Sequence, residues 1–394
     1  MDFDPLNFSD ISVYAGEEYV NAYNSITTPI IQTSTFVFRN SQDIDNYTHG
    51  INMRYEYGRY GNPTQTAAEK KLAALEGAEE AVLFSSGMSA ITTTLLALLR
   101  SGDHIVITDD AYKKTLEFCK TALPQYGVES TVVSVHDYEA MEAAIRPNTR
   151  IFFSESPTNP YLNVMDLERL SKMVAGKNIY LISDSTFATP YNQRPLELGV
   201  NIVIHSCTKY LAGHNDLLAG VVLGPSALIG PIRDFHKMMG GVIGPFTSYM
   251  LIRGLKTFAL RMQRFNENGQ KIAEYLEKHP RIQNVYYPGL PSHRYCELAK
   301  RTMRGFGAVV TFEVDADYDG TRLFLDRLQR LRIGPSFGGV ESLITHPASV
   351  SYYNYAREER LALGIKDNLV RFAAGIEEAE AIIEDLEQAL SVLK

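Results

Sequence analysis

Short apolar segments alternate with amphipathic stretches from about residue 80 to about residue 207. The short segments are rich in β-branched and aromatic residues, are apolar at consecutive positions, and end in Ser, Asp, Gly or Pro. Strands covered by helices on both faces have this pattern, because neither face meets water. We therefore predict an α/β domain with a mostly parallel sheet sandwiched by helices. The predicted strands lie in "EAVLFSSG", "HIVITDD", "STVVSV", "RIFFSESP", "IYLISDST" and "NIVIHSC".

The pattern changes near residue 255. "MQRFNENGQKIAEYLEKHP" has the periodicity of a helix, whereas "GAVVTFEVDAD" and "NLVRFAAGIE" are typical of strands. A last helix is predicted by apolar residues that recur at helical spacing: Ile382, Ile383, Leu386, Leu390 and Leu393. We therefore divide the chain into an α/β domain over residues 61–256 and a smaller α+β domain over residues 257–394.

Residues 1–60 are polar and aromatic and show only weak periodicity. They contain too few core residues to fold alone, because a small segment buries too little apolar surface. We expect them to form an arm that contacts a neighbouring subunit.

Composition narrows the class of protein. The chain has 394 residues, of which 45% are hydrophobic and 21% charged. No apolar run reaches the roughly 18 residues of a membrane span, and a formal net charge of −8 disfavours a nucleic-acid partner. The first residues, "MDFDPLNFSD", lack the pattern of a secretion signal or transit peptide, so we expect a cytoplasmic protein. The cysteines Cys119, Cys207 and Cys296 form neither a disulfide framework nor a metal-binding pair.

The ends of the predicted strands carry polar groups, and ligands bind at the carboxyl edge of such sheets. In "FSSGMSA", Ser85, Ser86 and Gly87 lead into a helix whose free N–H groups attract an anion such as phosphate. A turn that only caps the helix remains the alternative. The segment matches neither nucleotide-binding glycine motif, so a nucleotide is not indicated.

Three further strand ends bear reactive or flat side chains. Asp184 follows an apolar run and either forms a turn or faces a protonated ring nitrogen. Lys209 follows the next strand. It is either an exposed lysine at the start of a helix or a nucleophilic amine with a lowered pKa. Tyr112 either stacks on a ligand or is an ordinary core or surface tyrosine. Together with the phosphate turn, these groups are what pyridoxal phosphate (PLP) needs. A metal site at His205 and His214 is disfavoured, since no cysteine or carboxylate cluster supports it.

The chain resembles the Cys/Met-metabolism family of PLP-dependent enzymes, and within it the plant-type cystathionine γ-synthases. The resemblance runs from "TTPI" near residue 28 to the C-terminus and rests on "YEYGRYGNPT", "SSGMSA", "ESPTNP", "HSCTKYLAGHND", "PSFGGVESL" and "NLVRFAAGIE". It implies the fold type I of PLP-dependent transferases, with a large domain, a smaller C-terminal domain and an N-terminal arm.

The resemblance also implies roles around the cofactor ring. Lys209 would form the covalent link to PLP, and Tyr112 would stack on the ring as a second catalytic residue. Asp184 would pair with the ring nitrogen, with Thr186 nearby, and Asn159 would contact the ring oxygen.

The cofactor phosphate would be held from two sides. The chain's own contribution would come from Gly87, Met88, Ser206 and Thr208. Tyr57 and Arg59 of "YGRYGNPT" would reach the phosphate of a neighbouring subunit. The resemblance therefore implies shared active sites in a homotetramer built as a dimer of dimers.

Substrate binding is assigned in the same way. Arg371 would grip the carboxylate of a small amino-acid substrate, with Ser336 and Glu341 close by. Lys113 and Lys114 follow the stacking tyrosine much as "YRK" does in the plant-type enzymes. Either the two lysines are an ordinary solvated surface pair, or one of them, for which the resemblance favours Lys114, contacts the distal end of the substrate.

The leading hypothesis is a γ-replacement on an O-activated homoserine by a thiol such as cysteine, in sulfur amino-acid metabolism. The alternative is a γ- or β-lyase acting on cystathionine, methionine or cystine, because both reactions pass through the same site. A protein that keeps the fold without turnover is disfavoured, since every reacting residue is present.

Overall fold

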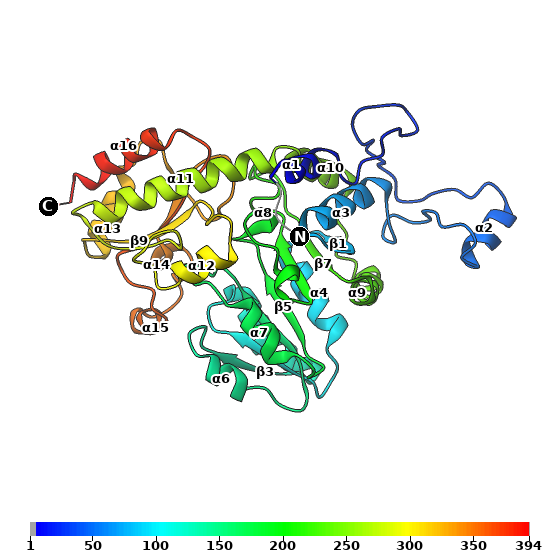
Figure 1. Cartoon of the computed structure of the whole chain (residues 1–394), viewed down its shortest axis with the longest axis horizontal. Coiled ribbons are helices and arrows are strands. Elements are labelled where there is room, and N and C mark those ends of the chain that lie inside the picture. Colours follow the sequence, from blue (N-terminus) through cyan, green and yellow to red (C-terminus); the bar gives the residue numbers. More distant parts are fainter. Residues whose placement is uncertain (1–4, 394) are drawn as a thin grey trace.

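The computed structural model describes residues 5–393, and a seven-stranded sheet forms the centre of its larger part (Figure 1). The strand order is β1-β7-β6-β5-β4-β2-β3. All neighbouring pairs are parallel except those of β7, which runs antiparallel to both β6 and β1. The strands are β1 (Glu80–Phe84), β2 (His104–Thr108), β3 (Glu129–Val133), β4 (Thr149–Glu155), β5 (Tyr180–Asp184), β6 (Ile202–Ser206) and β7 (Gly220–Gly224).

Helices cover this sheet on both faces, as the consecutive apolar residues of its strands predict. In β4, Ile151 and Phe153 pack with helices α4 and α9, whereas Phe152 between them packs on the other side with α6 and α7. The helical elements of this part are α3 (Pro63–Glu76), α4 (Gly87–Leu98), α5 (Lys113–Glu117), η1 (Phe118–Ala122), η2 (Leu123–Tyr126), α6 (Tyr138–Ala143), α7 (Leu167–Val174), α8 (Thr189–Asn192), η3 (Pro195–Leu198), α9 (Ser226–Met239) and α10 (Pro245–Leu255).

A second, five-stranded sheet with the order β10-β11-β12-β9-β8 lies in the C-terminal part. The long helix α11 packs beside it, and the predicted last helix is present as α16, with Ile382, Leu386 and Leu390 buried (Figure 1). The elements are α11 (Phe258–Lys278), β8 (Ile282–Tyr286), α12 (Cys296–Thr302), β9 (Val309–Val314), α13 (Tyr318–Asp326), β10 (Arg332–Ile333), β11 (Leu343–Thr345), α14 (Pro347–Val350), α15 (Arg357–Ala362), β12 (Leu369–Ala373) and α16 (Ala379–Leu390).

The N-terminal region has two parts. Helix α1 (Pro5–Tyr14) packs on its own chain, because Phe8 is buried against Phe258 and Tyr191. The segment that follows, with α2 (Ser41–Thr48), projects away from the body (Figure 1). The expected arm is therefore shorter at its start than residues 1–60, and residues 1–4 lie outside the described range.

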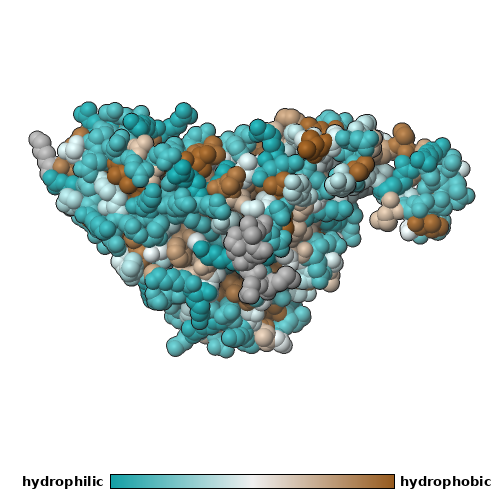
Figure 2. Space-filling model, turned by 45° about the horizontal axis from the view of Figure 1, so that its top comes forward, coloured by the Kyte–Doolittle hydropathy of each residue, from teal (hydrophilic) through white to brown (hydrophobic). Residues whose placement is uncertain are grey.

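The projecting segment exposes many large apolar side chains. Figure 2 shows apolar residues at its outer end. Exposed residues in this range include Tyr19, Ile26, Val37, Ile51 and Met53. Exposed apolar groups of this extent are typical of a surface that another protein covers. Contact with a neighbouring subunit remains our prediction.

Within residues 5–393, no helix is both long enough and apolar enough to cross a membrane.

Candidate active site

The carboxyl ends of β1, β2, β4, β5 and β6 meet at one edge of the large sheet, because these strands point the same way. Glu155 at the end of β4 pairs in register with Asp184 at the end of β5, and Asp184 in turn with Ile204 of β6. Lys209 follows β6 in a tight turn, where its N–H donates to the carbonyl of Ser206 (3.2 Å). The sheet thus gathers residues that are far apart in sequence.

Lys209 is a buried amine with few partners. Its Nζ donates to Ser336 Oγ (2.7 Å) and lies 5.1 Å from the ring centre of Phe337. Burial, aided by the nearby Arg371 guanidinium, lowers the pKa of Lys209 from 10.5 to about 8. Ser336 has a φ of 96°, a backbone conformation that residues other than glycine seldom adopt. The site therefore places a partly neutral amine against the C-terminal part of the chain.

Asp184 is buried and only half satisfied. Its Oδ1 accepts hydrogen bonds from Thr186 Oγ1 (2.6 Å) and Thr186 N (3.0 Å). Its Oδ2 has no hydrogen-bond partner among residues 5–393. Burial raises the pKa of this carboxyl. The two hydrogen bonds from Thr186 lower it, but the effect of burial is larger. A protonated pyridine nitrogen at the free oxygen would satisfy it and favour its charged form.

The start of α4 lies against the end of β6, as expected for a phosphate cradle. Ser86 caps the helix, and its Oγ accepts from Ser89 N (3.0 Å). A Cβ added to Gly87 would come within 2.9 Å of the Cβ of Ser206, so only glycine allows this approach. Thr208 lies close by, and its Oγ1 accepts from Ala219 N (3.0 Å). The free N–H groups of Gly87 and Met88 stand in the first turn of α4, where anions bind.

Arg371 in β12 faces the same region from the second sheet. Its Nη1 donates to Asn159 Oδ1 (3.1 Å) and its Nη2 to the Ser336 carbonyl (2.9 Å). Its Nε is buried without a partner among the described residues. Burial lowers the pKa of this guanidinium to about 10. The sequence-predicted Asn159, Ser336 and Arg371 therefore form one hydrogen-bonded group.

Tyr112 is positioned by a residue that the sequence analysis did not single out. The backbone N–H of Tyr112 donates to Glu155 Oε2 (2.7 Å). Burial raises the pKa of Glu155 well above its usual value, and the charges of Asp184 and Asp110 raise it further. Tyr112 itself is 43% exposed, which leaves its ring free for stacking. Glu155 opens the motif "ESPTNP", and its place at a strand end was the available signal.

The two lysines after Tyr112 point to different partners. Lys113 donates its Nζ to the Ser351 carbonyl and lies 5.6 Å from the ring centre of Tyr352. Lys114 is exposed and pairs with Glu117 (2.6 Å), which raises the lysine's pKa. The predicted substrate contact of Lys114 thus requires it to exchange this surface partner.

A cavity of about 690 Å³ opens beside Lys209. Thr208, Ser336 and Glu341 also line it, and Glu341 Oε2 accepts from Asn215 Nδ2 (2.8 Å). The expected substrate residue Glu341 therefore shares a cavity with the reactive amine.

Tyr57 and Arg59 lie away from Lys209 and Asp184 in the described chain. Arg59 Nη1 donates to the Lys237 carbonyl (2.6 Å), and its guanidinium lies 5.5 Å from the ring centre of Tyr57. Neither residue contacts Lys209 or Asp184 within residues 5–393. Their predicted contact with a cofactor phosphate thus requires another subunit.

A buried pair of side chains behind the sheet edge was not predicted from the sequence. His205 Nε2 lies 2.9 Å from Glu76 Oε2, and both side chains are almost fully buried. Burial raises the pKa of Glu76, against the nearby histidine. In the described part of the chain, no group of three or more potential ligands could hold a metal ion.

This arrangement fits PLP. The buried amine of Lys209 matches its aldehyde, the free oxygen of Asp184 matches its ring nitrogen, and the first turn of α4 suits its phosphate.

Comparisons with known proteins identify the family of the chain. The family model for Cys/Met metabolism PLP-dependent enzymes matches residues 9–391. The chain is 46% identical to the chloroplastic cystathionine γ-synthase 1 of Arabidopsis thaliana over 97% of this chain and 69% of that protein. It is 44% identical to an L-methionine γ-lyase of Fusobacterium nucleatum over 94% of each chain.

The solved structure of cystathionine γ-lyase from Lactobacillus plantarum, in complex with L-serine, has the same fold. Its TM-score is 0.90 at 36% identity, over 98% of both chains. The predicted fold type I and the predicted cofactor are confirmed by this likeness and by the family match. The chain belongs to the Cys/Met metabolism family of PLP-dependent enzymes.

Proposed function

We propose that this PLP-dependent enzyme catalyses γ-replacement, in which a thiol such as cysteine displaces the activated oxygen of an O-acyl or O-phosphoryl homoserine. The observation that carries the proposal is the position of Lys209, a buried amine of lowered pKa between Ser336 and the cation of Arg371, beside an open cavity. The similarity to the Arabidopsis synthase over nearly the whole chain favours replacement.

The chain's own residues divide the work. Arg371 binds the substrate carboxylate, since it is buried, cationic and has a free Nε. When bound, PLP would withdraw electrons from Cα and so acidify first the Cα proton and then the Cβ proton. Lys209 would accept the Cα proton on Nζ, which its lowered pKa permits near neutral pH. Asp184 would hold the ring nitrogen protonated.

Replacement and elimination differ in what happens at Cγ after the acid group has left. The activated homoserine loses its acid group from Cγ as acetate, succinate or phosphate. In replacement, the thiol sulfur bonds to Cγ and releases its proton, which gives cystathionine when the thiol is cysteine. In elimination, nothing bonds to Cγ, and the unsaturated amino acid that remains is hydrolysed at C2: water supplies the carbonyl oxygen of a 2-oxo acid, and the nitrogen leaves as ammonia. Elimination is the second candidate function, because the chain is 44% identical to an L-methionine γ-lyase.

We further propose a homotetramer whose arms complete neighbouring active sites. The support is the projecting, apolar segment around Met53, together with the absence of any contact between Arg59 and Lys209 within residues 5–393. Exposed apolar surface of this kind is stabilised when a partner covers it.

The test of function is a substrate panel. The O-acetyl, O-succinyl and O-phosphoryl esters of homoserine are each incubated with the holoenzyme, with and without cysteine, and the products are separated. Replacement predicts that cystathionine predominates over the 2-oxo acid whenever cysteine is present. A 2-oxo acid that predominates at saturating cysteine would contradict replacement and favour the lyase. Lys209→Ala serves as the inactive control.

A further inference from the structure

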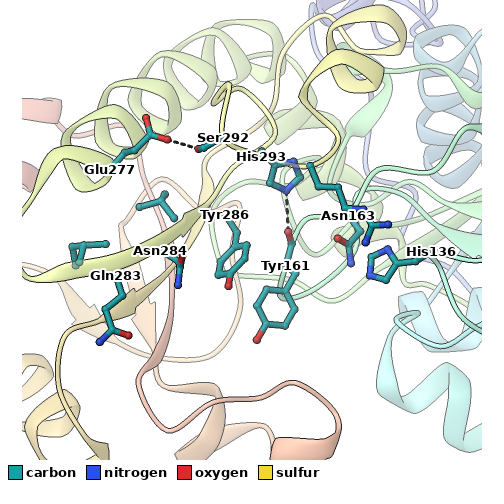
Figure 3. Close-up of a pocket in the computed structure, with 12 residues that line it drawn as sticks. His136, Tyr161, Asn163, Glu277, Gln283, Asn284, Tyr286, Ser292 and His293 are labelled. Carbon is teal, nitrogen blue, oxygen red and sulfur yellow. Dashed lines mark hydrogen bonds between the residues drawn. The ribbon is translucent and has the colours of Figure 1, made fainter.

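A cleft of about 440 Å³ lies between the large part of the chain and the second sheet, apart from the cavity beside Lys209 (Figure 3). Its floor comes from β8, which among residues 5–393 pairs only with β9 and is an edge strand of the second sheet. The opposite side comes from the turn after β4 and from the segment that precedes α6. None of the residues to which we assign a role in catalysis lines this cleft.

Two tyrosines, Tyr161 and Tyr286, form flat walls in the middle of the cleft (Figure 3). Their ring centres are 4.7 Å apart, and the rings meet edge to face. Both hydroxyls are engaged, since Tyr161 donates to the Gly364 carbonyl and Tyr286 to Glu313 Oε1 (2.6 Å). The tyrosines therefore offer ring surface rather than free hydroxyls to a ligand.

Two donors stand at the end of the cleft near the large part. Arg294 is exposed and makes no hydrogen bond or ion pair with residues 5–393; its guanidinium lies 5.7 Å from the ring centre of Tyr295. His136 contacts the Tyr295 hydroxyl through Nδ1, which leaves Nε2 free among the described residues. When Nδ1 accepts from that hydroxyl, Nε2 carries the proton and becomes a donor.

The other polar groups of the cleft already have partners. His293 accepts from Tyr295 N at Nδ1 (3.3 Å) and donates from Nε2 to the Tyr161 carbonyl (3.2 Å). The carboxylate of Glu277 accepts from Ser292 Oγ at the far end (Figure 3). Asp109 lies near His136, and its Oδ1 accepts from Val135 N (2.9 Å). The free donors are thus gathered at one end, beside aromatic walls.

One short turn connects the cleft with the active site. Asn159 contacts Arg371, while Tyr161 and Asn163, a few residues further on, line the cleft. The turn is held together because Asn163 N donates to Thr158 Oγ1 (3.1 Å). Asn163 Nδ2 also donates to Asp110 Oδ2 (3.2 Å), next to the segment that carries Tyr112. A ligand that shifts this turn would shift a partner of Arg371.

We propose that this cleft is a second binding site, which takes a small organic acid and communicates with the active site through residues 158–163. The carboxylate binds Arg294 and His136 Nε2, and the apolar part of the acid lies against Tyr161 and Tyr286. A charge-assisted contact orients the anion, and the rings select for an apolar body over a bare inorganic anion. Binding of the acid then shifts the conformational equilibrium of the turn, and the conformation of the turn changes the affinity for the acid, as coupling between sites requires.

The probe is 4-fluorophenylacetate, which has no amine to react with the cofactor, and binding to the holoenzyme is followed by ¹⁹F NMR. We expect a Kd in the range of about 1 mM. Arg294→Gln should weaken binding at least about fivefold, discounted for the exposure of the arginine. Arg330→Gln removes an exposed arginine elsewhere in the small domain and should change nothing. Inorganic phosphate should bind more weakly than the probe.

Equal binding to the wild type and to Arg294→Gln would overturn the site, whatever the outcome of the substrate panel. Phosphate that binds as tightly as the probe would contradict the organic acid as ligand. The communication is read separately, by hydrogen exchange of the peptide that covers residues 158–163. Slower exchange with the probe is expected in the wild type but not in Arg294→Gln. Unchanged exchange at saturating probe would contradict communication through this turn.

Discussion

At the residue scale, the surroundings of Lys209 favour the neutral form of its amine. Burial removes the water that would stabilise an ammonium, and the Arg371 guanidinium adds a like charge, so the pKa falls to about 8. The neutral amine is the form that attacks an aldehyde and accepts a proton. Arg371 thus binds the substrate carboxylate and also helps to activate the lysine.

This pKa predicts how the apoenzyme captures PLP. Only the neutral amine reacts, so the capture rate should rise with pH and level off above about 8. Stopped-flow absorbance at a series of pH values measures it. Arg371→Gln should move the inflection to higher pH because it removes a like charge. A rate that keeps rising toward 10.5, the ordinary pKa of lysine, would contradict the depressed value.

Glu155 should act as a neutral hydrogen-bond acceptor. Burial and two neighbouring carboxylates raise its pKa, and its Oε2 holds the backbone of Tyr112. Glu155→Gln keeps an acceptor of the same shape and should retain nearly wild-type PLP affinity. Glu155→Ala frees the Tyr112 segment and should weaken PLP binding roughly tenfold, measured by equilibrium dialysis. A Gln variant as impaired as the Ala variant would mean that the charge of Glu155 matters.

Sequence alone predicted roles for the residues whose chemistry shows in a motif. Lys209, Asp184 and Arg371 were named this way, and the structure brings them to one region. The pair of His205 and Glu76 was missed, because its members lie 129 positions apart and only the fold joins them. A spacing of that size carries no periodic signal.

At the element scale, the apolar runs predicted the parallel strands because burial on both faces leaves a clear pattern. The reversed direction of β7 was not predicted. Its five residues are all buried, as those of β2 are, so its composition does not encode its direction. The packing of α1 on its own chain was missed as well, since Phe8 and the partly buried Ile11 give too short an apolar pattern to predict it.

The start of α5 offers a test of substrate choice. Lys114 is an exposed cation close to Tyr112, so Lys114→Ala should lower kcat/KM about twofold to fivefold for the phosphoryl and succinyl esters. It should change little for the neutral acetyl ester. Lys113 instead ties α5 to Ser351, so Lys113→Ala should affect all three esters alike. The opposite pattern, with ester selectivity lost only in Lys113→Ala, would assign the substrate contact to Lys113.

At the scale of the whole molecule, the projecting segment of Figure 1 favours our proposal that one chain completes the site of another. Its apolar side chains around Val37 and Met53 face solvent, and Arg59 lies against α9. We expect assembly to bury this surface and to bring Arg59 to a neighbouring phosphate.

Subunit mixing tests this expectation. Arg59→Ala and Lys209→Ala proteins are each inactive in our account, but a mixed dimer contains one site with both native residues. After complete exchange, about a quarter of the wild-type activity should return, because half of the dimers are mixed and each has one intact site. Mass spectrometry of the intact dimers confirms the mixing. No recovery in dimers shown to be mixed would place both residues in the same site.

We propose that the chemistry of this enzyme rests on Lys209, and peptide mapping can locate the reacting lysine. The holoenzyme is reduced with borohydride, digested and analysed by mass spectrometry. The account predicts a pyridoxyl group on the peptide that contains Lys209 and none in Lys209→Ala, because this amine is buried with a pKa lowered to about 8. A pyridoxyl group found on any other lysine of the wild-type protein would contradict it.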